Sequence, residues 1–247
     1  MSEKQLTIRR LVNDDGFRKL AEKTLGERTS QFMSSVLSLV NANQTLQRAD
    51  PIKVYNACLM SASLNLPVNN NLGYAYIIPY KDDVQLQIGW KGFVQLAQRS
   101  GQFKTIVANP VYENELTGVN PMTGEVEFEF KIEKGGAIVG YMAYFKLLNG
   151  FEKSLYMSVK ELNTHAKKYS QTFKKGDGVW NDNFDAMAIK TVVKLLLNKF
   201  APLSIDMQKA IKIDQKVDDD YKDNKPSFDV EGAELGDNEN TTNDNKA

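Results

Sequence analysis

The sequence predicts an α+β fold in which an antiparallel β-sheet is packed by helices. Apolar residues recur at helical spacing toward both ends of the folded part, whereas segments with β-rich sequences and glycine-containing turns fill the middle. No internal repeat with a period of about 20 to 50 residues is evident. The 247 residues therefore suit one domain with an appended tail.

The first part of the chain is predicted to be helical. Residues 1–28 are expected to form an N-terminal segment that contacts neighbouring subunits. A folded core is expected over residues 29–213, and it begins where apolar residues recur at helical spacing between 29 and 47. A second helix is predicted from Asp50, whose side chain caps the helix while Pro51 occupies the first turn.

A β-hairpin and a third helix are expected to follow. Residues 74–80 and 84–89 have β-rich sequences joined by a short polar connection, which predicts a pair of strands. The polar residues Asn69–Gly73 indicate a turn before the hairpin, although their amides could instead bind phosphate. The second strand leads into a helix that begins at Trp90 and ends near Gly101.

Four further segments are predicted to be strands between turns. They span residues 104–116, 125–133, 137–148 and 151–158. Asn149 and Gly150 predict a tight hairpin between the last two segments. Ser158 is then expected to cap a helix that runs through His165.

The last long helix is predicted to begin at Asp182 and to end at Ala201, because the residue before Pro202 is disfavoured in helical geometry. Residues 214–247 contain 11 acidic residues and 4 lysines with almost no apolar periodicity, so they are expected to form a disordered acidic tail. Of the 31 acidic and 31 basic residues, 20 and 27 then remain in residues 1–213. A basic body is compatible with a polyanionic partner.

Several classes of enzyme lack their motifs in this sequence. It contains no GxxxxGK[ST] loop, no dinucleotide-binding fingerprint and no GxSxG turn. Cys58 is the only cysteine, which favours a reducing cytosol. His165 is the only histidine and is expected to be a surface or helix-packing residue rather than a metal ligand. No apolar run is long enough for a signal peptide or a membrane span. We therefore expect a soluble, cytoplasmic protein that needs no cofactor, and nothing in the sequence supports an ATP motor.

Lys190 and Lys194 lie one turn apart in a helix that is otherwise largely apolar. Because their like charges repel each other, the two ammonium groups are expected to point into a wet groove where phosphates offset the repulsion. The alternative is that both lysines extend to the surface of an ordinary core helix.

The segment 86–106 mixes cations with aromatic rings. A helix that begins at Trp90 would bring Lys91 and Arg99 within about a quarter-turn of each other, and Lys104 follows the end of that helix. Cations beside rings suit a single strand of nucleic acid, whose backbone attracts cations and whose bases stack on rings. The alternative is that the rings belong to the core.

Five separated motifs say more about function than the spacing of apolar residues does. They are, in order, ACLMSASLNLPVNNNLGYAYIIPY, LQIGWKGFVQLAQRSGQF, VYENE, KKYSQ and FDAMAIKTVVKLLLNKFAPLSI. From about Phe32 to about Ile205, the chain resembles the RecT family of phage and prophage single-strand annealing recombinases. The resemblance implies an ATP-independent protein that coats single-stranded DNA, pairs it with a complementary strand and holds the new duplex.

The resemblance also implies partners and DNA contacts. It implies homo-oligomeric rings or helical filaments with a basic groove, a phage exonuclease that makes the single strands, and the host single-strand binding protein. The matching positions nominate as DNA contacts Gln87, Trp90, Lys91, Arg99, Lys190 and Lys194, followed by Lys104, Lys168 and Lys199. Trp90 replaces the tyrosine that is usual in the family's QIGYKG motif, and it retains an aromatic ring.

Two other functions remain open at this point. A general single-strand coating protein would bind DNA without accelerating pairing. A metal-dependent nuclease would use carboxylates on strands, for which the sequence offers Glu113, Glu115, Glu125, Glu127 and Glu129. The acidic tail could solubilise the protein, dock a partner or compete with DNA for the basic groove.

Overall fold

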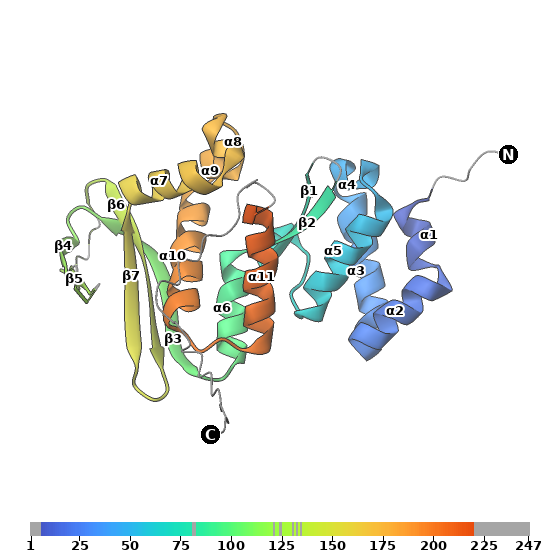
Figure 1. Ribbon diagram of the computed structural model, residues 1–247, viewed down its shortest axis with the longest axis horizontal. Helices are drawn as coiled ribbons and strands as arrows, with labels where there is room; N and C mark the ends of the chain where they lie inside the picture. Colours follow the sequence, from blue (N-terminus) through green and yellow to red (C-terminus); the bar gives the residue numbers. More distant parts are fainter. Residues whose placement is uncertain are drawn as a thin grey trace, which may run out of the picture.

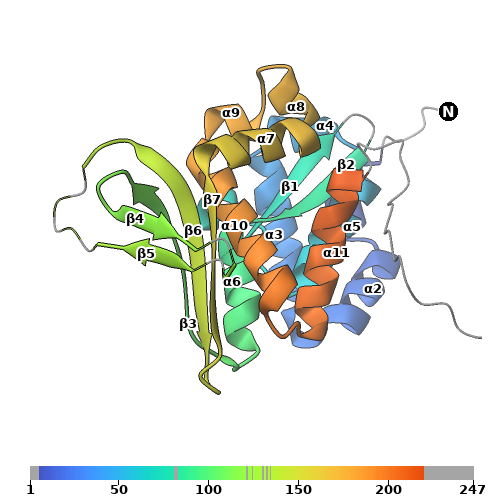
Figure 2. The same cartoon turned by 60° about the vertical axis from the view of Figure 1, so that its left-hand side comes forward.

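The computed structural model has helices at one end and an antiparallel sheet at the other (Figure 1). It describes residues 6–80, 83–120, 122, 123, 125–129, 131, 133 and 135–219. Helices α6 (Trp90–Arg99), α10 (Phe184–Phe200) and α11 (Ile205–Asp219) lie between the two ends in this view, and Figure 2 shows α6 and α10 beside the main sheet from another side. The predicted α+β class, with antiparallel β-structure packed by helices, is confirmed.

Five helices build the helical end. Helices α1 to α5 span Ile8–Val12, Asp15–Leu25, Thr29–Asn41, Gln44–Arg48 and Pro51–Ser63. Asp50 caps α5 with its carboxylate, as predicted. The predicted single helix over residues 29–47 is two helices, because the side chain of Asn43 caps a separate helix α4.

The N-terminal helices share the core of the rest of the chain. Leu11 and Ala21 are buried in it, and the hydroxyl of Tyr55 in α5 donates a hydrogen bond to the carbonyl of Phe17 at 2.6 Å. The rings of Phe17 and Tyr55 also meet edge to face, with 5.0 Å between their centroids. A boundary at residue 29 therefore does not separate these helices from the core, and their contact with other subunits stays a prediction.

Within the described residues, seven strands form three antiparallel sheets. They are β1 (Ala75–Tyr80), β2 (Asp83–Ile88), β3 (Phe103–Tyr112), β4 (Leu116–Val119), β5 (Val126–Phe128), β6 (Ile138–Leu147) and β7 (Glu152–Ser158). β1 pairs with β2 and β4 with β5, while the main sheet has the order β3-β6-β7. The predicted hairpins before Trp90 and around Asn149 and Gly150 are both present.

Helices α7, α8, α9 and α10 follow the main sheet. They span Val159–Tyr169, Gln171–Lys174, Val179–Asp182 and Phe184–Phe200. Ser158 starts α7 in a capping box with Glu161, as predicted. α10 packs against all three strands of the main sheet and is capped by Asn183 instead of the expected Asp182, because the Asn183 side chain accepts the amide of Ala186. None of the helices described here is long and apolar enough to span a membrane.

A further helix, α11 (Ile205–Asp219), was not expected. It packs against β2 and α6 (Trp90–Arg99), and its Met207, Ala210 and Asp214 are buried. The predicted start of a disordered tail at residue 214 is therefore wrong for residues 214–219, which are helical. The remainder of the predicted tail lies outside the described residues.

Two glycines let α6 approach the turn before β1. A Cβ at Gly89 would lie 2.1 Å from the carbonyl oxygen of Gly73, and a Cβ at Gly92 would lie 2.2 Å from that of Tyr74. The amide of Gly89 also donates to the carbonyl of Tyr74 at 2.9 Å. The turn itself is present as predicted, as a short 3-10 helix over Asn70–Leu72.

Gly92→Ala is expected to destabilise the protein by about 1–3 kcal/mol, because its Cβ would force two backbone segments apart. Alanine in a helix interior normally stabilises relative to glycine by about 1 kcal/mol, so the sign of the effect is informative. Urea unfolding would measure it, with Gln98→Ala on the exposed side of α6 as the control. A Gly92→Ala variant at least as stable as the wild type would contradict the close contact.

Candidate nucleic-acid interface

The end of β2 meets α10 and α11 at one carboxylate. The backbone N–H of Ile88 donates to Oδ1 of Asp214 at 3.3 Å. Lys190 Nζ donates to the same oxygen at 2.8 Å, and Lys194 Nζ donates to Oδ2 at 2.8 Å. We call this cluster of Ile88, Lys190, Lys194 and Asp214 the Asp214 junction.

The Asp214 junction is largely removed from solvent. The side chain of Asp214 is 3% exposed, while those of Lys190 and Lys194 are 14% and 18% exposed. Burial raises the pKa of Asp214, but the charges of the two lysines and their hydrogen bonds together outweigh burial and hold that pKa below its usual value. The carboxylate is therefore ionised at neutral pH.

The junction changes the interpretation of the lysine pair. Lys190 and Lys194 are neighbours on one face of α10, as predicted, but in this structure Asp214 offsets their repulsion. The expectation that both point into an open groove is not met, because α11 lies over them and both are mostly buried. The sequence interpretation missed Asp214 because it assigned residue 214 to the tail.

Three of the candidate residues surround Ile88 at the start of α6. Gln87 and Trp90 are half-buried and Lys91 is exposed. Lys91 Nζ lies 5.8 Å from the centroid of the Trp90 ring, within reach of a cation–π interaction. An accessible cation beside a ring is the combination that proteins use to bind single-stranded nucleic acid.

Arg99 has a structural role at the other end of α6. Its guanidinium donates to the carbonyls of Leu64 and Asn65, each at 2.8 Å. These carbonyls follow the last turn of α5, where backbone acceptors lack partners within the helix. Arg99 therefore fastens α6 to α5, and its guanidinium is engaged by backbone in this structure.

The remaining candidates are exposed and lie on separate elements. Lys104 belongs to β3, Lys168 to α7 and Lys199 to the last turn of α10. Lys168 Nζ lies 5.3 Å from the ring centroid of Tyr169. It is also one of four exposed lysines between the last turn of α7 and the end of α8, namely Lys167, Lys168, Lys174 and Lys175. The two lysine pairs in HAKKYSQTFKKG were the available signal for this group, and only Lys168 was named from the sequence.

Groups that could support metal or nucleophilic chemistry are separated from one another. Among the residues that the structure describes, no three histidine, cysteine, aspartate or glutamate side chains gather where they could hold a metal ion. Cys58 is buried, and burial raises the pKa of its thiol to about 12. His165 packs against the rings of Tyr169 and Trp180, with centroid distances of 4.5 and 6.4 Å, as expected for a histidine that packs within the fold.

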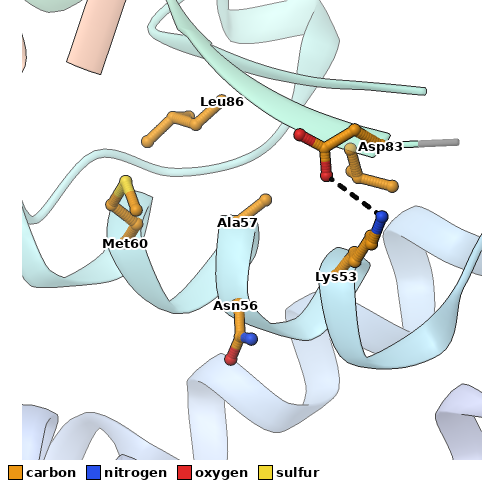
Figure 3. A pocket seen from close by; sticks show the side chains of 7 residues that line it. Lys53, Asn56, Ala57, Met60, Asp83 and Leu86 are labelled. Atoms are coloured by element: carbon orange, nitrogen blue, oxygen red, sulfur yellow. Dashed lines mark ion pairs between the residues drawn. The ribbon is translucent and has the colours of Figure 1, made fainter. Parts of the chain in front are cut away.

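A pocket opens between α5 and β2 (Figure 3). Its lining consists of Lys53, Asn56, Ala57, Met60, Asp83, Val84 and Leu86. Lys53 and Asp83 form an exposed ion pair at 3.6 Å on one side, and apolar side chains, including Met60 and Leu86, make up much of the remainder. The lining contains neither histidine nor cysteine and only one carboxylate, so it offers a contact surface rather than a catalytic group.

Comparison with known proteins gives related sequences. The model of the RecT family matches residues 30–228. The chain is 44% identical over 205 residues to the uncharacterized protein YqaK of Bacillus subtilis (strain 168), a match that covers 83% of this chain and 71% of YqaK. It is 27% identical over 189 residues to Protein RecT of Escherichia coli (strain K12), and this match covers 69% of the chain and 65% of that protein. The chain thus spans slightly less than two thirds of Escherichia coli RecT.

Asp214→Ala is expected to lower the free energy of unfolding by about 3–5 kcal/mol, because it leaves two mostly buried ammonium groups without their shared carboxylate. Asp206→Ala removes an exposed carboxylate from the first turn of the same helix and should cost at most about 1 kcal/mol. Urea unfolding near neutral pH measures both. Equal effects of the two substitutions would contradict the ion pairs.

The contribution of Asp214 should also depend on pH. A carboxyl group whose pKa is lowered by folding stabilises the protein above its unfolded pKa, about 3.9, and loses this effect as the pH falls through the folded pKa. The stability difference between wild type and Asp214→Ala should therefore be complete at neutral pH and shrink below about pH 4. A difference that stays constant or grows in acid would be inconsistent with the lowered pKa.

Proposed function

We propose that this chain, which belongs to the RecT family of single-strand annealing recombination proteins, binds single-stranded DNA and pairs it with a complementary strand without ATP. The family match over residues 30–228 carries the proposal. The absence of a phosphate-binding GxxxxGK[ST] loop from the sequence supports independence from ATP. On this proposal the protein binds DNA during recombination and is not an enzyme.

The single strand is proposed to cross the start of α6. Lys91 is exposed there and would contact phosphate, while Trp90 offers a ring and Gln87 a polar side chain. The exposed lysines at positions 104, 168 and 199 would contact phosphates farther along a basic groove. Contact through Arg99, Lys190 or Lys194 would require an exchange of their present partners.

The proposed assembly is a homo-oligomer, either a ring or a helical filament, that also holds the annealed duplex. Residues 1–28 are proposed to contribute contacts between subunits, which is supported by the exposure of Leu6 at 43% and Leu20 at 45%. A phage exonuclease and the host single-strand binding protein are proposed partners. The protein would act in the cytoplasm, where these DNA intermediates arise.

The purified protein is expected to accelerate annealing of complementary oligonucleotides equally with and without ATP. Binding of a single strand should weaken with salt, with a log–log slope of about −0.7 for each phosphate neutralised. Fluorescence resonance energy transfer between labelled strands measures annealing, and anisotropy measures binding. A strict requirement for ATP would overturn the mechanism.

The same assay separates the two alternative functions. A coating protein would bind the single strand but leave the pairing rate unchanged. A nuclease would shorten end-labelled DNA in the presence of magnesium.

Lys91→Gln is expected to weaken binding of single-stranded DNA and to reduce the magnitude of the salt slope by about 0.7, because one phosphate contact is lost. Lys23→Gln is the matched control, since Lys23 is also exposed but lies on α2, away from α6. Both variants should unfold at the wild-type urea concentration. Equal binding by the two variants would remove Lys91 from the proposed interface.

A further inference from the structure

The Asp214 junction has the donor arrangement of an anion-binding site. Two ammonium groups and one backbone N–H converge on the carboxylate, at 2.8, 2.8 and 3.3 Å. The N–H belongs to Ile88, the last residue of β2, which directly precedes Gly89, the N-cap of α6. Lysines combined with a backbone amide are donors that proteins use for phosphate.

We propose that the donors of Lys190, Lys194 and Ile88 form a phosphate site for single-stranded DNA, which α11 masks with the carboxylate of Asp214. DNA and α11 therefore compete for the same donors. The inference rests on the proposed function, because it assumes that the chain binds single-stranded DNA. It adds a self-inhibitory contact, in which α11 must withdraw before the strand reaches the two lysines.

The two helices are held by different parts of the fold. In α10, the side chains of Val192, Val193 and Leu196 are fully buried, and the helix packs on all three strands of the main sheet. α11 packs against β2 and α6 and buries Met207 and Ala210. It is joined to α10 by residues 201–204, which have no regular structure, and its first residue, Ile205, is 71% exposed. The lysines are therefore held on the main sheet, whereas their carboxylate partner comes from a helix that does not pack on that sheet.

The sequence that follows Asp214 is acidic, and its negative charge resembles that of a DNA backbone. After three intervening residues, the sequence continues with Asp218, Asp219 and Asp220. A run of carboxylates presents the same sign of charge as a run of phosphates, and its attachment to the protein keeps it at high local concentration. An acidic segment in this position suits a competitor for a phosphate site.

The opposite role for Asp214 would be to hold the two lysines in place for DNA while remaining paired with them. The two roles predict opposite effects when the charge is removed. If Asp214 masks the site, its neutralisation strengthens binding. If Asp214 positions the lysines, its neutralisation weakens binding.

Asp214→Asn in the full chain tests this difference, because asparagine keeps the size of the side chain and removes its charge. We expect about tenfold tighter binding of a fluorescent oligodeoxythymidine, which corresponds to about 1.4 kcal/mol. Asp206→Asn removes the same charge from an exposed position in the same helix, so it reports any general electrostatic effect. Adding Lys190→Gln to Asp214→Asn should abolish the gain. Unchanged or weaker binding by a folded Asp214→Asn protein would overturn the masking.

Hydrogen exchange of the wild-type chain provides a second test that does not depend on a stable variant. Addition of oligodeoxythymidine should accelerate exchange of the backbone amides of α11, because the strand displaces the helix. Binding accompanied by unchanged or slower exchange in α11 overturns the masking but leaves the proposed function intact. Absence of binding by the wild type and both single variants of α11 overturns the proposed function together with the masking.

Discussion

The carboxylate of Asp214 joins three segments that are distant in the sequence: the end of β2, the middle of α10 and the second half of α11. Its partners in α10 are 24 and 20 residues away, and Ile88 is 126 residues away. Because breaking a buried ion pair is costly while its net contribution to stability is small, such a contact acts mainly to fix one arrangement of helices. It adds a polar connection to the apolar packing of α11 against β2 and α6.

The short segment that follows β2 combines support of the fold with accessible chemistry. A side chain would not fit at Gly89 or Gly92, because backbone carbonyls occupy that space. Arg99 donates hydrogen bonds to the carbonyls at the end of α5. Between Gly89 and Arg99, Trp90 is half-buried and Lys91 is exposed, so a ligand can reach both side chains. This division explains why glycines, cations and a large ring occur within so few residues.

Local signals in the sequence were sufficient to predict the β1–β2 hairpin, α6, the β6–β7 hairpin and the cap of α7. Each depends on neighbouring residues, such as Asn149 with Gly150 or Ser158 with Glu161. α11 could not be predicted in the same way, because its buried face includes an aspartate and the following sequence is acidic. The role of Asp214 becomes visible only when α10 supplies its two lysines, which is a property of tertiary structure. The same limit applies to Arg99, whose carbonyl partners lie 34 and 35 residues away.

In the proposed mechanism, DNA occupies the start of α6 and replaces Asp214 at Lys190 and Lys194. Electron cryo-microscopy of the full chain, with two complementary oligonucleotides added in succession, would locate both strands. Phosphates are expected beside Lys91, Lys190 and Lys194, with α11 withdrawn from the lysines of α10. DNA bound on another face, with Asp214 still paired to both lysines, would rule the mechanism out.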